Sequence, residues 1–235
     1  MIKKKIHYCW FSRGEKTKLA KKCLASWRKY CPDYEIIEWN EDNFDINTNA
    51  YTKMCYDQKK YAFLSDYLRL VIIDKYGGIY FDTDVELVRN FDTLLGCEAF
   101  FGFENEKNVA TGLGFGAESG NEIVKRMLAE YDVLLDGKHG TVGCPILNTN
   151  ALLKLGLQQN GELQKIKGAV VFPIDYFNPY DDPTGRLRKT TNTYSIHWYA
   201  KSWLNKKTVL RTKIMKPIHR MFGKDIFSSL RKQSR

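Results

Sequence analysis

The sequence predicts an α/β domain built around a mostly parallel sheet. Short apolar stretches rich in strand-forming residues alternate with longer segments of helical periodicity, and this alternation is typical of such sheets. The 235 residues suffice for one large domain, or for one domain with a small appendage. Hydrophobic residues make up 43% of the chain and aromatic residues 14%, so a packed core is expected rather than disorder.

Each expected helix is justified by its pattern of apolar residues and by its end signals. Leu19, Cys23 and Trp27 recur on one helical face near the N-terminus. The next helix is almost wholly apolar and stops at Gly77-Gly78, a common C-terminal signal. The expected helices span residues 18–29, 62–76, 121–135 and 145–155.

The expected strands are short runs of apolar, β-branched or aromatic residues. They span residues 5–10, 34–39, 79–81, 85–88, 99–103, 112–115, 169–172 and 194–198. Residues 40–49 are too rich in Asn and Asp for regular structure. Ligands of such sheets bind beyond the carboxyl ends of the strands. Trp10, Asn40 and Asp82 lie at three of these ends, so we expect one crevice to collect them.

Composition argues against several classes of protein. No apolar run approaches the roughly 20 residues that a membrane span needs. The first residues lack a secretory apolar segment, so we expect a cytoplasmic protein. The six cysteines form no C-x-x-C pair, which argues against a zinc site or a redox dithiol and favours small buried side chains.

The net charge of +10 is concentrated at the C-terminus. Residues 201–235 contain eleven of the 37 Lys and Arg residues and one of the 27 acidic residues, Asp225, which leaves 26 of each sign in residues 1–200. A neutral body with a basic end indicates that the C-terminal segment recognises an anionic surface.

Asp82 and Asp84, in the run YGGIYFDTDVE, form the most informative motif of the chain. Residues two apart in an extended chain project to the same side, roughly 6.5–7 Å apart. A divalent cation offsets the desolvation of two such carboxylates and keeps coordination positions open for phosphate oxygens. The geometry therefore predicts a metal–diphosphate site. Asp clusters also occur in solvated turns, so the motif alone does not decide between the two.

Asp66 and Arg69 lie three residues apart on the apolar helix 62–76 and therefore share a face. One interpretation is a buried structural ion pair. The other is that Arg69 binds a phosphate and Asp66 a sugar hydroxyl, because a guanidinium fork suits phosphate oxygens. The Gly77-Gly78 turn joins this helix directly to the acidic strand end.

Four segments together resemble a known family. KKIHYCWF, YEIIEWNEDNF, KKYAFLSDYLRLVIIDKYGGIYFDTDVE and FFGFEN are similar to the bacterial family 32 glycosyltransferases, which share the DXD sugar-binding region. They also resemble, more distantly, the glucosyltransferase domains of large clostridial toxins. The resemblance covers about residues 2–105 and is patchy afterwards. It implies a GT-A fold that uses a nucleoside diphosphate sugar, a UDP-sugar by expectation, and Mn²⁺ or Mg²⁺.

The resemblance also implies roles for residues of the first half. Trp10 would stack on the uracil ring, although a core aromatic side chain at a strand end is the alternative. Ser65, Asp66 and Arg69 would contact the sugar and the diphosphate. Asp66 and Arg69 are thereby catalytic candidates.

The metal side of the expected site joins two distant segments. By resemblance, Asp82 would contact ribose, sugar or the metal and its water, and Asp84 would bind the metal directly; both are catalytic candidates. The segment SIHWYAKSW resembles a second metal-side element of the family. His197 would supply a further ligand there, with Ser202 and Trp203 closing over the pyrophosphate. A histidine after a strand also occurs as a structural residue, so both interpretations stay open.

The expected reaction moves a hexose from the donor to a glycan acceptor in surface polysaccharide synthesis, such as that of capsule or lipopolysaccharide. The metal and Arg69 would stabilise the departing diphosphate, and Asp66 would orient the sugar. The resemblance implies retention of anomeric configuration, and no acid stands out as a covalent nucleophile. Residues 143–147 (GCPIL) resemble an acceptor-side segment, whereas His7 and His139 are expected to be structural or surface residues.

Three other functions compete with this one. A basic nucleic-acid-binding protein fits the charge, but the excess charge lies in the C-terminal segment and the body lacks a known binding module, so no nucleic acid is expected. A metal-dependent phosphohydrolase would also use acids and a divalent ion. A catalytically inactive binding module is disfavoured by the intact acidic residues.

We expect a glycosyltransferase domain over residues 1–205 and a basic amphipathic extension over residues 206–235. Lys and Arg alternate there with apolar residues, and Pro217 is expected to separate two short helices. The extension either packs its apolar face on the body or docks on anionic lipid. The second alternative would hold the enzyme peripherally at the inner face of the membrane, beside a lipid-linked or oligosaccharide acceptor.

Overall fold

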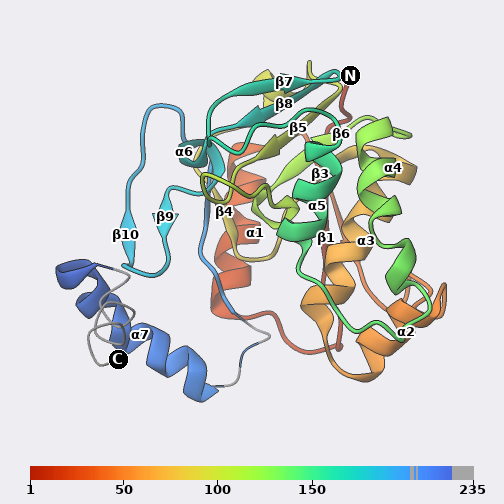
Figure 1. The fold of residues 1–235 in the computed structure, drawn as a ribbon, viewed down its shortest axis with the longest axis horizontal. Helices are drawn as coiled ribbons and strands as arrows, with labels where there is room; N and C mark the ends of the chain where they lie inside the picture. Colours follow the sequence, from red (N-terminus) through yellow and green to blue (C-terminus); the bar gives the residue numbers. More distant parts are fainter. Residues whose placement is uncertain (202–203, 205, 224–235) are drawn as a thin grey trace, which may run out of the picture.

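A seven-stranded sheet in the order β2-β1-β3-β6-β5-β8-β7 forms the centre of the molecule (Figure 1). The computed structural model describes residues 1–201, 204 and 206–223. The strands are β1 (Lys5–Cys9), β2 (Glu35–Trp39), β3 (Gly78–Tyr80), β5 (Ala99–Gly102), β6 (Phe115–Ala117), β7 (Gln164–Ile166) and β8 (Ala169–Phe172). Five of them run in one direction, and β6 and β7 run in the other. The expected α/β fold with a mostly parallel sheet is therefore confirmed.

Helices cover both faces of this sheet (Figure 1). The helices are α1 (Lys18–Tyr30), α2 (Ala50–Asp57), α3 (Tyr61–Tyr76), α4 (Glu122–Ala129), α5 (Cys144–Leu153), α6 (Ile174–Phe177) and α7 (Lys206–Phe222). Successive residues of a strand belong to the hydrophobic cores on opposite faces of the sheet. In β3, Tyr80 belongs to the core that includes residues of α2 to α5, whereas Ile79 belongs to the core that includes residues of α1. This alternation explains why the strands are apolar throughout.

Two small antiparallel pairs extend the architecture beyond the main sheet. β4 (Val85–Leu87) pairs with β11 (Ser195–His197), and β9 (Tyr180–Asp181) pairs with β10 (Arg186–Leu187). The expected strands over residues 85–88 and 194–198 are thus real, but they form their own pair outside the central sheet. The pairing carries the C-terminal residues back to the segment that follows β3.

The Gly77-Gly78 turn fixes the geometry between α3 and β3. Gly77 and Gly78 have φ angles of +66° and +108°, in the left-handed region that glycine tolerates. A Cβ at Gly78 would lie 2.8 Å from the Lys5 carbonyl oxygen of β1. The turn therefore requires glycine both for its backbone angles and for its contact with the sheet.

Several expected elements differ from the structure. The strand expected over residues 112–115 is a short 3-10 helix, η2 (Thr111–Leu113), followed by β6. The helix expected over residues 121–135 ends at Ala129, and a turn and η3 (Asp132–Leu134) follow. α2, α6, β7, β9 and β10 were not expected from the sequence. Residues 40–49 are irregular up to Asn49, whose side chain caps α2 in a capping box with Thr52.

The expectation that Pro217 separates two helices is wrong, because α7 runs through Pro217. Proline removes one N–H from the helical ladder, and the remaining turns of α7 are held by contacts to the β9–β10 hairpin. No helix among the described residues is long and apolar enough to cross a membrane.

Candidate active site

A cleft of about 650 Å³ opens at the carboxyl edge of the sheet. Seven of the predicted site residues line it: Trp10, Ser65, Asp66, Arg69, Asp82, Asp84 and His197. The other two, Ser202 and Trp203, lie outside the described residues. Asn40 does not line the cleft, because its side chain bonds to Glu38 and to the Asp42 N–H in its own loop. The expected crevice thus collects Trp10 and Asp82 but leaves out Asn40.

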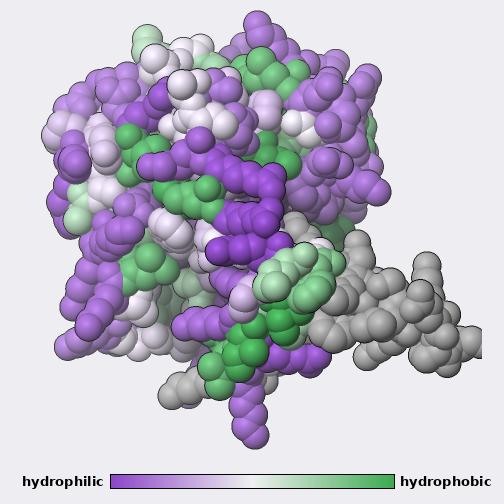
Figure 2. All heavy atoms as spheres, turned by 90° about the vertical axis from the view of Figure 1, so that its left-hand side faces the viewer, coloured by the Kyte–Doolittle hydropathy of each residue, from purple (hydrophilic) through white to green (hydrophobic). Residues whose placement is uncertain are grey.

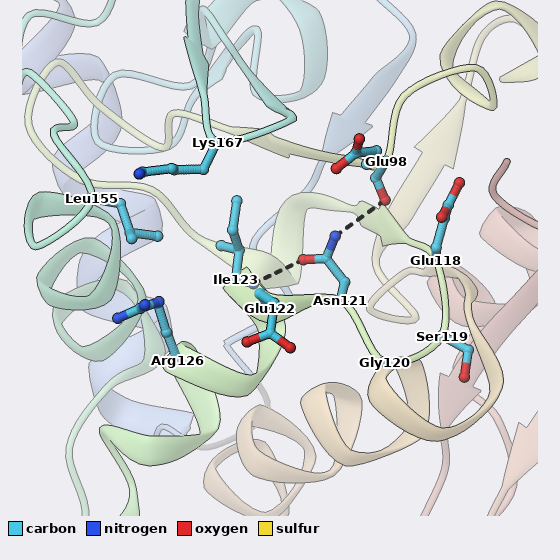
Figure 3. A pocket seen from close by; sticks show the side chains of 10 residues that line it. All are labelled: Glu98, Glu118, Ser119, Gly120, Asn121, Glu122, Ile123, Arg126, Leu155 and Lys167. Carbon is cyan, nitrogen blue, oxygen red and sulfur yellow. Dashed lines mark hydrogen bonds between the residues drawn. The ribbon is translucent and has the colours of Figure 1, made fainter.

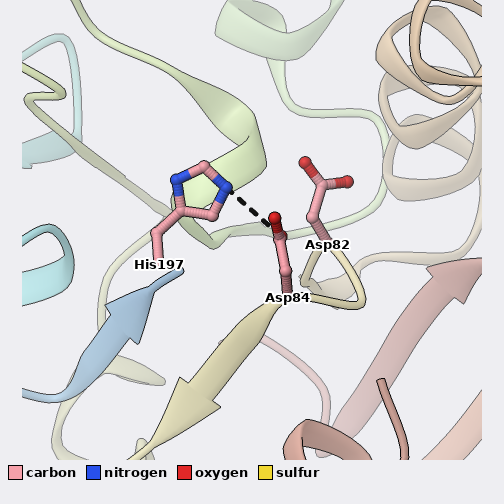
Figure 4. Close-up of side chains that lie close together, drawn as sticks. All are labelled: Asp82, Asp84 and His197. Atoms are coloured by element: carbon pink, nitrogen blue, oxygen red, sulfur yellow. Dashed lines mark ion pairs between the residues drawn. The ribbon is translucent and has the colours of Figure 1, made fainter. Parts of the chain in front are cut away.

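Asp82, Asp84 and His197 converge at the inner end of this cleft (Figure 4). Their potential ligand atoms all lie within 4.8 Å of one another. The β4–β11 register places His197 opposite Val85, directly after Asp84. His197 Nε2 donates to Asp84 Oδ1 over 3.2 Å. The strand pairing therefore brings together two segments more than 100 residues apart.

Backbone and ring donors fix the Asp84 carboxylate. The Ala200 N–H donates to Asp84 Oδ2 over 2.6 Å. Burial acts to raise the pKa of Asp84, but the charge and hydrogen bond of His197 and the Ala200 N–H outweigh burial and lower that pKa. Burial acts to lower the pKa of His197, and the Asp84 carboxylate outweighs it and raises that pKa. Asp84 and His197 thus form a largely buried ion pair, with side chains 13% and 12% exposed.

Arg69 contacts Asp82 and is only 1% exposed. Its Nη2 contacts Asp66 Oδ1 at 2.8 Å and Asp82 Oδ1 at 3.0 Å, and its Nε donates to the Ser65 carbonyl oxygen over 3.0 Å. The predicted ion pair between Asp66 and Arg69 is therefore present. Arg69 Nη1 is buried and has no hydrogen-bond partner among the described residues. A buried donor without a partner is costly, so this N–H is suited to an incoming anion.

Negative charge exceeds positive charge on this side of the cleft. Burial raises the pKa of Asp82 to about 6, against the opposing charge of Arg69, and the charges of Asp84 and Asp66 add to the rise. Burial also raises the pKa of Asp66. Carboxylate oxygens are the ligands that Mg²⁺ and Mn²⁺ prefer. Two carboxylates beside an imidazole, with room in front of them, therefore fit a divalent cation with open positions.

Gly112 is a part of the site that sequence reasoning missed. A Cβ at Gly112 would lie 2.4 Å from Asp82 Oδ2 and 2.8 Å from Arg69 Nη1. Its short helix η2 is anchored by a hydrogen bond of 2.9 Å from buried Asn148 Nδ2 to Thr111 Oγ1. Because Gly112 has no side chain, the Asp82 carboxylate and the Arg69 guanidinium can occupy this space.

Glu104 and Tyr199 line the cleft and were also missed; the Tyr199 ring centroid lies 4.1 Å from that of His197. Burial raises the pKa of half-buried Glu104. Asn178 Nδ2 donates to the Tyr199 hydroxyl over 2.7 Å and to the Glu104 carbonyl oxygen over 2.9 Å. Tyr199 has a φ of +51°, an uncommon angle for a bulky residue that is often found at functional sites. The position of Glu104 directly after the strand 99–103 was the available signal.

Trp10 is half-buried, with part of its ring on the α1-side core and part in the cleft. Its Nε1–H donates to the Gly14 carbonyl oxygen over 2.8 Å, which fixes the indole edge. The Lys16 ammonium lies 5.6 Å from the ring centroid. Trp10 thus combines both interpretations from the sequence, since it contacts the core and faces the cleft.

The structure also places His7, His139 and the segment expected on the acceptor side. His7 is fully buried and exposed His139 pairs with Asp136, in agreement with structural and surface roles. Gly143 and Cys144 line the cleft, and the Cys144 N–H donates to Asp66 Oδ2 over 3.4 Å. The segment expected on the acceptor side therefore lies beside the acidic cluster.

A second, smaller pocket of about 380 Å³ lies at the opposite edge of the sheet (Figure 3). Its wall carries Glu98, Glu118 and Glu122 together with Arg126 and Lys167. Within the described ranges, the only three-residue group that offers a metal close ligands is the one in the large cleft. The chemistry of the molecule therefore concentrates at the carboxyl edge.

Comparison with known proteins identifies the region that contains the acidic motif. Residues 17–101 match the family model described as a glycosyltransferase sugar-binding region containing DXD motif. The PaToxG glycosyltransferase superposes with a TM-score of 0.53 at 18% identity, over 65% of this chain and 69% of that one. Comparison with curated proteins gave no match.

Two further structures superpose more loosely. A glycosyltransferase involved in the glycosylation of the major capsid of PBCV-1 has a TM-score of 0.45 and 11% identity, covering 90% of this chain and 98% of its own. The galactosyltransferase LgtC in complex with donor and acceptor sugar analogs has a TM-score of 0.46 and 12% identity, covering 90% and 95%.

The fold and the matched region define the class of this protein. The sheet and its helices have the GT-A arrangement, and the PaToxG superposition supports that fold. The matched region ends beyond Asp82 and Asp84, so it contains the acidic motif of the cleft. Residues 17–101 carry the DXD sugar-binding region of glycosyltransferases, which indicates a glycosyltransferase.

Proposed function

We propose that this protein transfers a hexose from a nucleoside diphosphate sugar, with UDP as the expected nucleotide, to a glycan acceptor. The observation that carries the proposal is the cluster of Asp82, Asp84 and His197 beside the unpartnered N–H of Arg69. An acidic cluster binds a cation, and an unpaired guanidinium N–H binds an anion. A metal-bound diphosphate offers both charges in one ligand.

The donor would lie along the cleft from Trp10 to the acidic cluster. Trp10 supports stacking of the base, because its ring faces the cleft and its edge is fixed by Gly14. Asp82, Asp84 and His197 would hold Mn²⁺ or Mg²⁺, which supplies positive charge to the diphosphate oxygens. Arg69 Nη1 would donate to a diphosphate oxygen.

The transfer breaks the bond between the anomeric carbon and the diphosphate oxygen and forms a bond to an acceptor hydroxyl oxygen. The hydroxyl proton leaves with the nucleoside diphosphate. Asp66 lies where it can accept a hydrogen bond from a sugar hydroxyl, since one of its oxygens bonds only weakly to the Cys144 N–H. Glu104, which also lines the cleft, is the second carboxylate available to a sugar. Orientation by these groups lowers the barrier because the reacting atoms are held in place.

A screen of UDP- and GDP-sugars for Mn²⁺-dependent thermal stabilisation tests the donor. A UDP-sugar should raise the melting temperature with Mn²⁺ and much less without it, since a ligand that binds only the folded state stabilises it. Stabilisation by GDP-sugars alone would contradict the choice of UDP. No stabilisation by any nucleotide sugar would contradict the proposal as a whole.

The stereochemical part of the proposal is retention of configuration. An α-linked donor should give an α-linked product, which NMR of the isolated glycan identifies from the anomeric coupling. A β-linked product would show inversion. The same assay separates transfer from phosphohydrolase activity, because a hydrolase uses water as the acceptor and gives no glycan when an acceptor sugar is added.

We also place the reaction in surface polysaccharide synthesis, with an oligosaccharide or lipid-linked acceptor. The open cleft, which has Gly143 and Cys144 in its lining, supports a glycan acceptor. Transfer to purified lipid-linked oligosaccharide, but not to a protein acceptor, is the expected result.

A further inference from the structure

Helix α7 is attached to the body through one of its sides. Lys216 Nζ donates to the Tyr180 hydroxyl over 2.7 Å and pairs with Asp182 at 3.0 Å. Arg220 Nη2 donates to the Gly185 carbonyl oxygen over 3.0 Å. These contacts all go to the β9–β10 hairpin, so the side of α7 that carries Lys216 faces the protein.

The other side of α7 is apolar and exposed. Leu210, Ile214, Pro217 and Met221 follow one another at spacings of four, three and four residues, which places them on one helical face. Leu210 and Ile214 are each 59% exposed and Met221 is 75% exposed. Figure 2 shows the apolar side chains of α7 as a strip on the outward side of the molecule. We call these four residues the apolar stripe.

An ordinary surface helix buries its apolar face, whereas α7 leaves the apolar stripe exposed and partly buries Val209, Met215 and Ile218 instead. Exposed cations flank the apolar stripe on both sides, with Lys207 and Arg211 on one side and Lys213 on the other. An apolar strip between basic side chains is the arrangement of helices that lie in the interface of an anionic bilayer.

We propose that the apolar stripe of α7 docks on an anionic lipid bilayer. The apolar side chains would enter the boundary between headgroups and acyl chains, while the flanking cations contact anionic headgroups. The helix lies on the membrane in this arrangement and does not cross it. The proposal concerns binding alone and holds whether or not the cleft transfers a hexose.

The attachment of α7 also places the cleft relative to the bilayer. Asp182, which pairs with Lys216 of α7, pairs with Lys201 at 2.5 Å as well. Lys201 lines the cleft. One carboxylate therefore ties α7 and the cleft to the same hairpin. The chain from Lys201 to Lys206 spans at most about 18 Å, so docked α7 keeps the cleft near the membrane surface.

Flotation of the full chain with vesicles, without any nucleotide sugar, tests the proposal. The chain should float with phosphatidylcholine vesicles that contain phosphatidylglycerol, and much less with pure phosphatidylcholine. The triple variant Leu210→Ser, Ile214→Ser and Met221→Ser should bind the anionic vesicles at least about tenfold more weakly, because three apolar side chains are lost. The matched control is Val133→Ser, Leu153→Ser and Leu163→Ser, which removes three exposed apolar side chains elsewhere on the body.

Several results would overturn the proposal. Unchanged flotation of the stripe variant would mean that the stripe does not contact lipid, whether residues 224–235 cover it or charge alone drives binding. A concentration-dependent dimer that only the stripe variant abolishes, without flotation of the original chain, would assign the stripe to a second copy. Equal loss of flotation in the control variant would show a general effect of surface polarity.

Discussion

Asp84 is the residue on which the proposed metal site most depends, because it bonds to His197 and Ala200 and faces Asp82. The substitution Asp84→Ala should abolish Mn²⁺-dependent stabilisation and reduce transfer by at least about 100-fold, the scale of losing a main electrostatic contact to the leaving group. Thermal shift with Mn²⁺ and UDP and a transfer assay measure the two effects. Asp136→Ala, at an exposed position outside the cleft, is the control. An Asp84→Ala variant with full activity would remove the site assignment.

Gly112 makes a sharper test of geometry, because the change adds only one methyl group. Gly112→Ala should displace the Asp82 carboxylate or the Arg69 guanidinium, since the new Cβ would lie 2.4 Å and 2.8 Å from them. We expect a loss of stability of about 1–3 kcal/mol, as for other overpacked sites, and a larger relative loss of transfer. Gly96→Ala adds the same methyl group where nothing lies within 4 Å. Equal activity of the two variants would contradict the role of Gly112.

The residues that sequence reasoning found and those that it missed differ in how their signal is encoded. Asp82 and Asp84 are two apart in a turn after β3, where the sequence predicted extended chain, and Asp66 and Arg69 are three apart on a helix. Both pairs are therefore close along the chain. Gly112 matters only because the fold brings its Cα against Asp82. No local pattern carries that information.

At the scale of elements, the well-predicted ones have long or strongly apolar patterns, such as α1, α3 and β1. The short elements β7, β9 and β10 have two or three residues each, too few for a period to emerge. β6 begins later in the chain than the expected strand over residues 112–115. The glycine-rich sequence of residues 112–116 is compatible with a 3-10 turn as well as with a strand, so the boundary could not be predicted. Its direction could not be predicted either, since parallel and antiparallel neighbours are chosen by the whole sheet.

The turn between α3 and β3 offers a prediction for one element. Gly78→Ala should destabilise the protein by about 2 kcal/mol or more, because alanine is strained at a φ of +108° and its Cβ would approach the Lys5 carbonyl oxygen. Urea unfolding measures the change. Gly120→Ala, at a φ of +74° with open space around it, reports backbone strain alone. If Gly78→Ala cost no more than Gly120→Ala, the close contact with β1 would have no energetic weight.

At the scale of the whole molecule, the excess basic residues and the acidic cluster lie in different parts of the chain. The basic excess lies in the C-terminal segment and the acids that face the donor lie in the cleft. This asymmetry could be predicted from the sequence, because it requires only a count of the charged residues in each segment. The outward direction of the apolar stripe depends on which side of α7 the hairpin holds, and that was beyond prediction from the order of residues.

Global stability should also depend on pH through His7, a buried residue of the central sheet. Its Nδ1 accepts from Trp39 Nε1–H over 3.1 Å and its Nε2 lies 3.0 Å from the Gly77 carbonyl oxygen. Burial lowers the pKa of His7 from its ordinary 6.5 to about 4. Between these two values the unfolded chain binds a proton that the folded chain does not, so the free energy of unfolding falls as the pH falls.

The size of this effect follows from the shift, and a variant isolates it. A difference of about 2.5 pKa units corresponds to about 3 kcal/mol, present above pH 6.5 and lost by pH 4. The pKa of Asp82, raised to about 6, contributes with the opposite sign in an overlapping range, so the pH profile of the original chain mixes the two effects.

The measurement is therefore the difference in unfolding free energy between the original chain and His7→Gln, taken by urea unfolding from pH 4 to 8. That difference should grow by about 3 kcal/mol as the pH rises from 4 to 7, because only the original chain carries the titrating imidazole. A difference that stays constant over this range would mean that His7 has the same pKa in the folded and the unfolded chain, so that burial does not shift it.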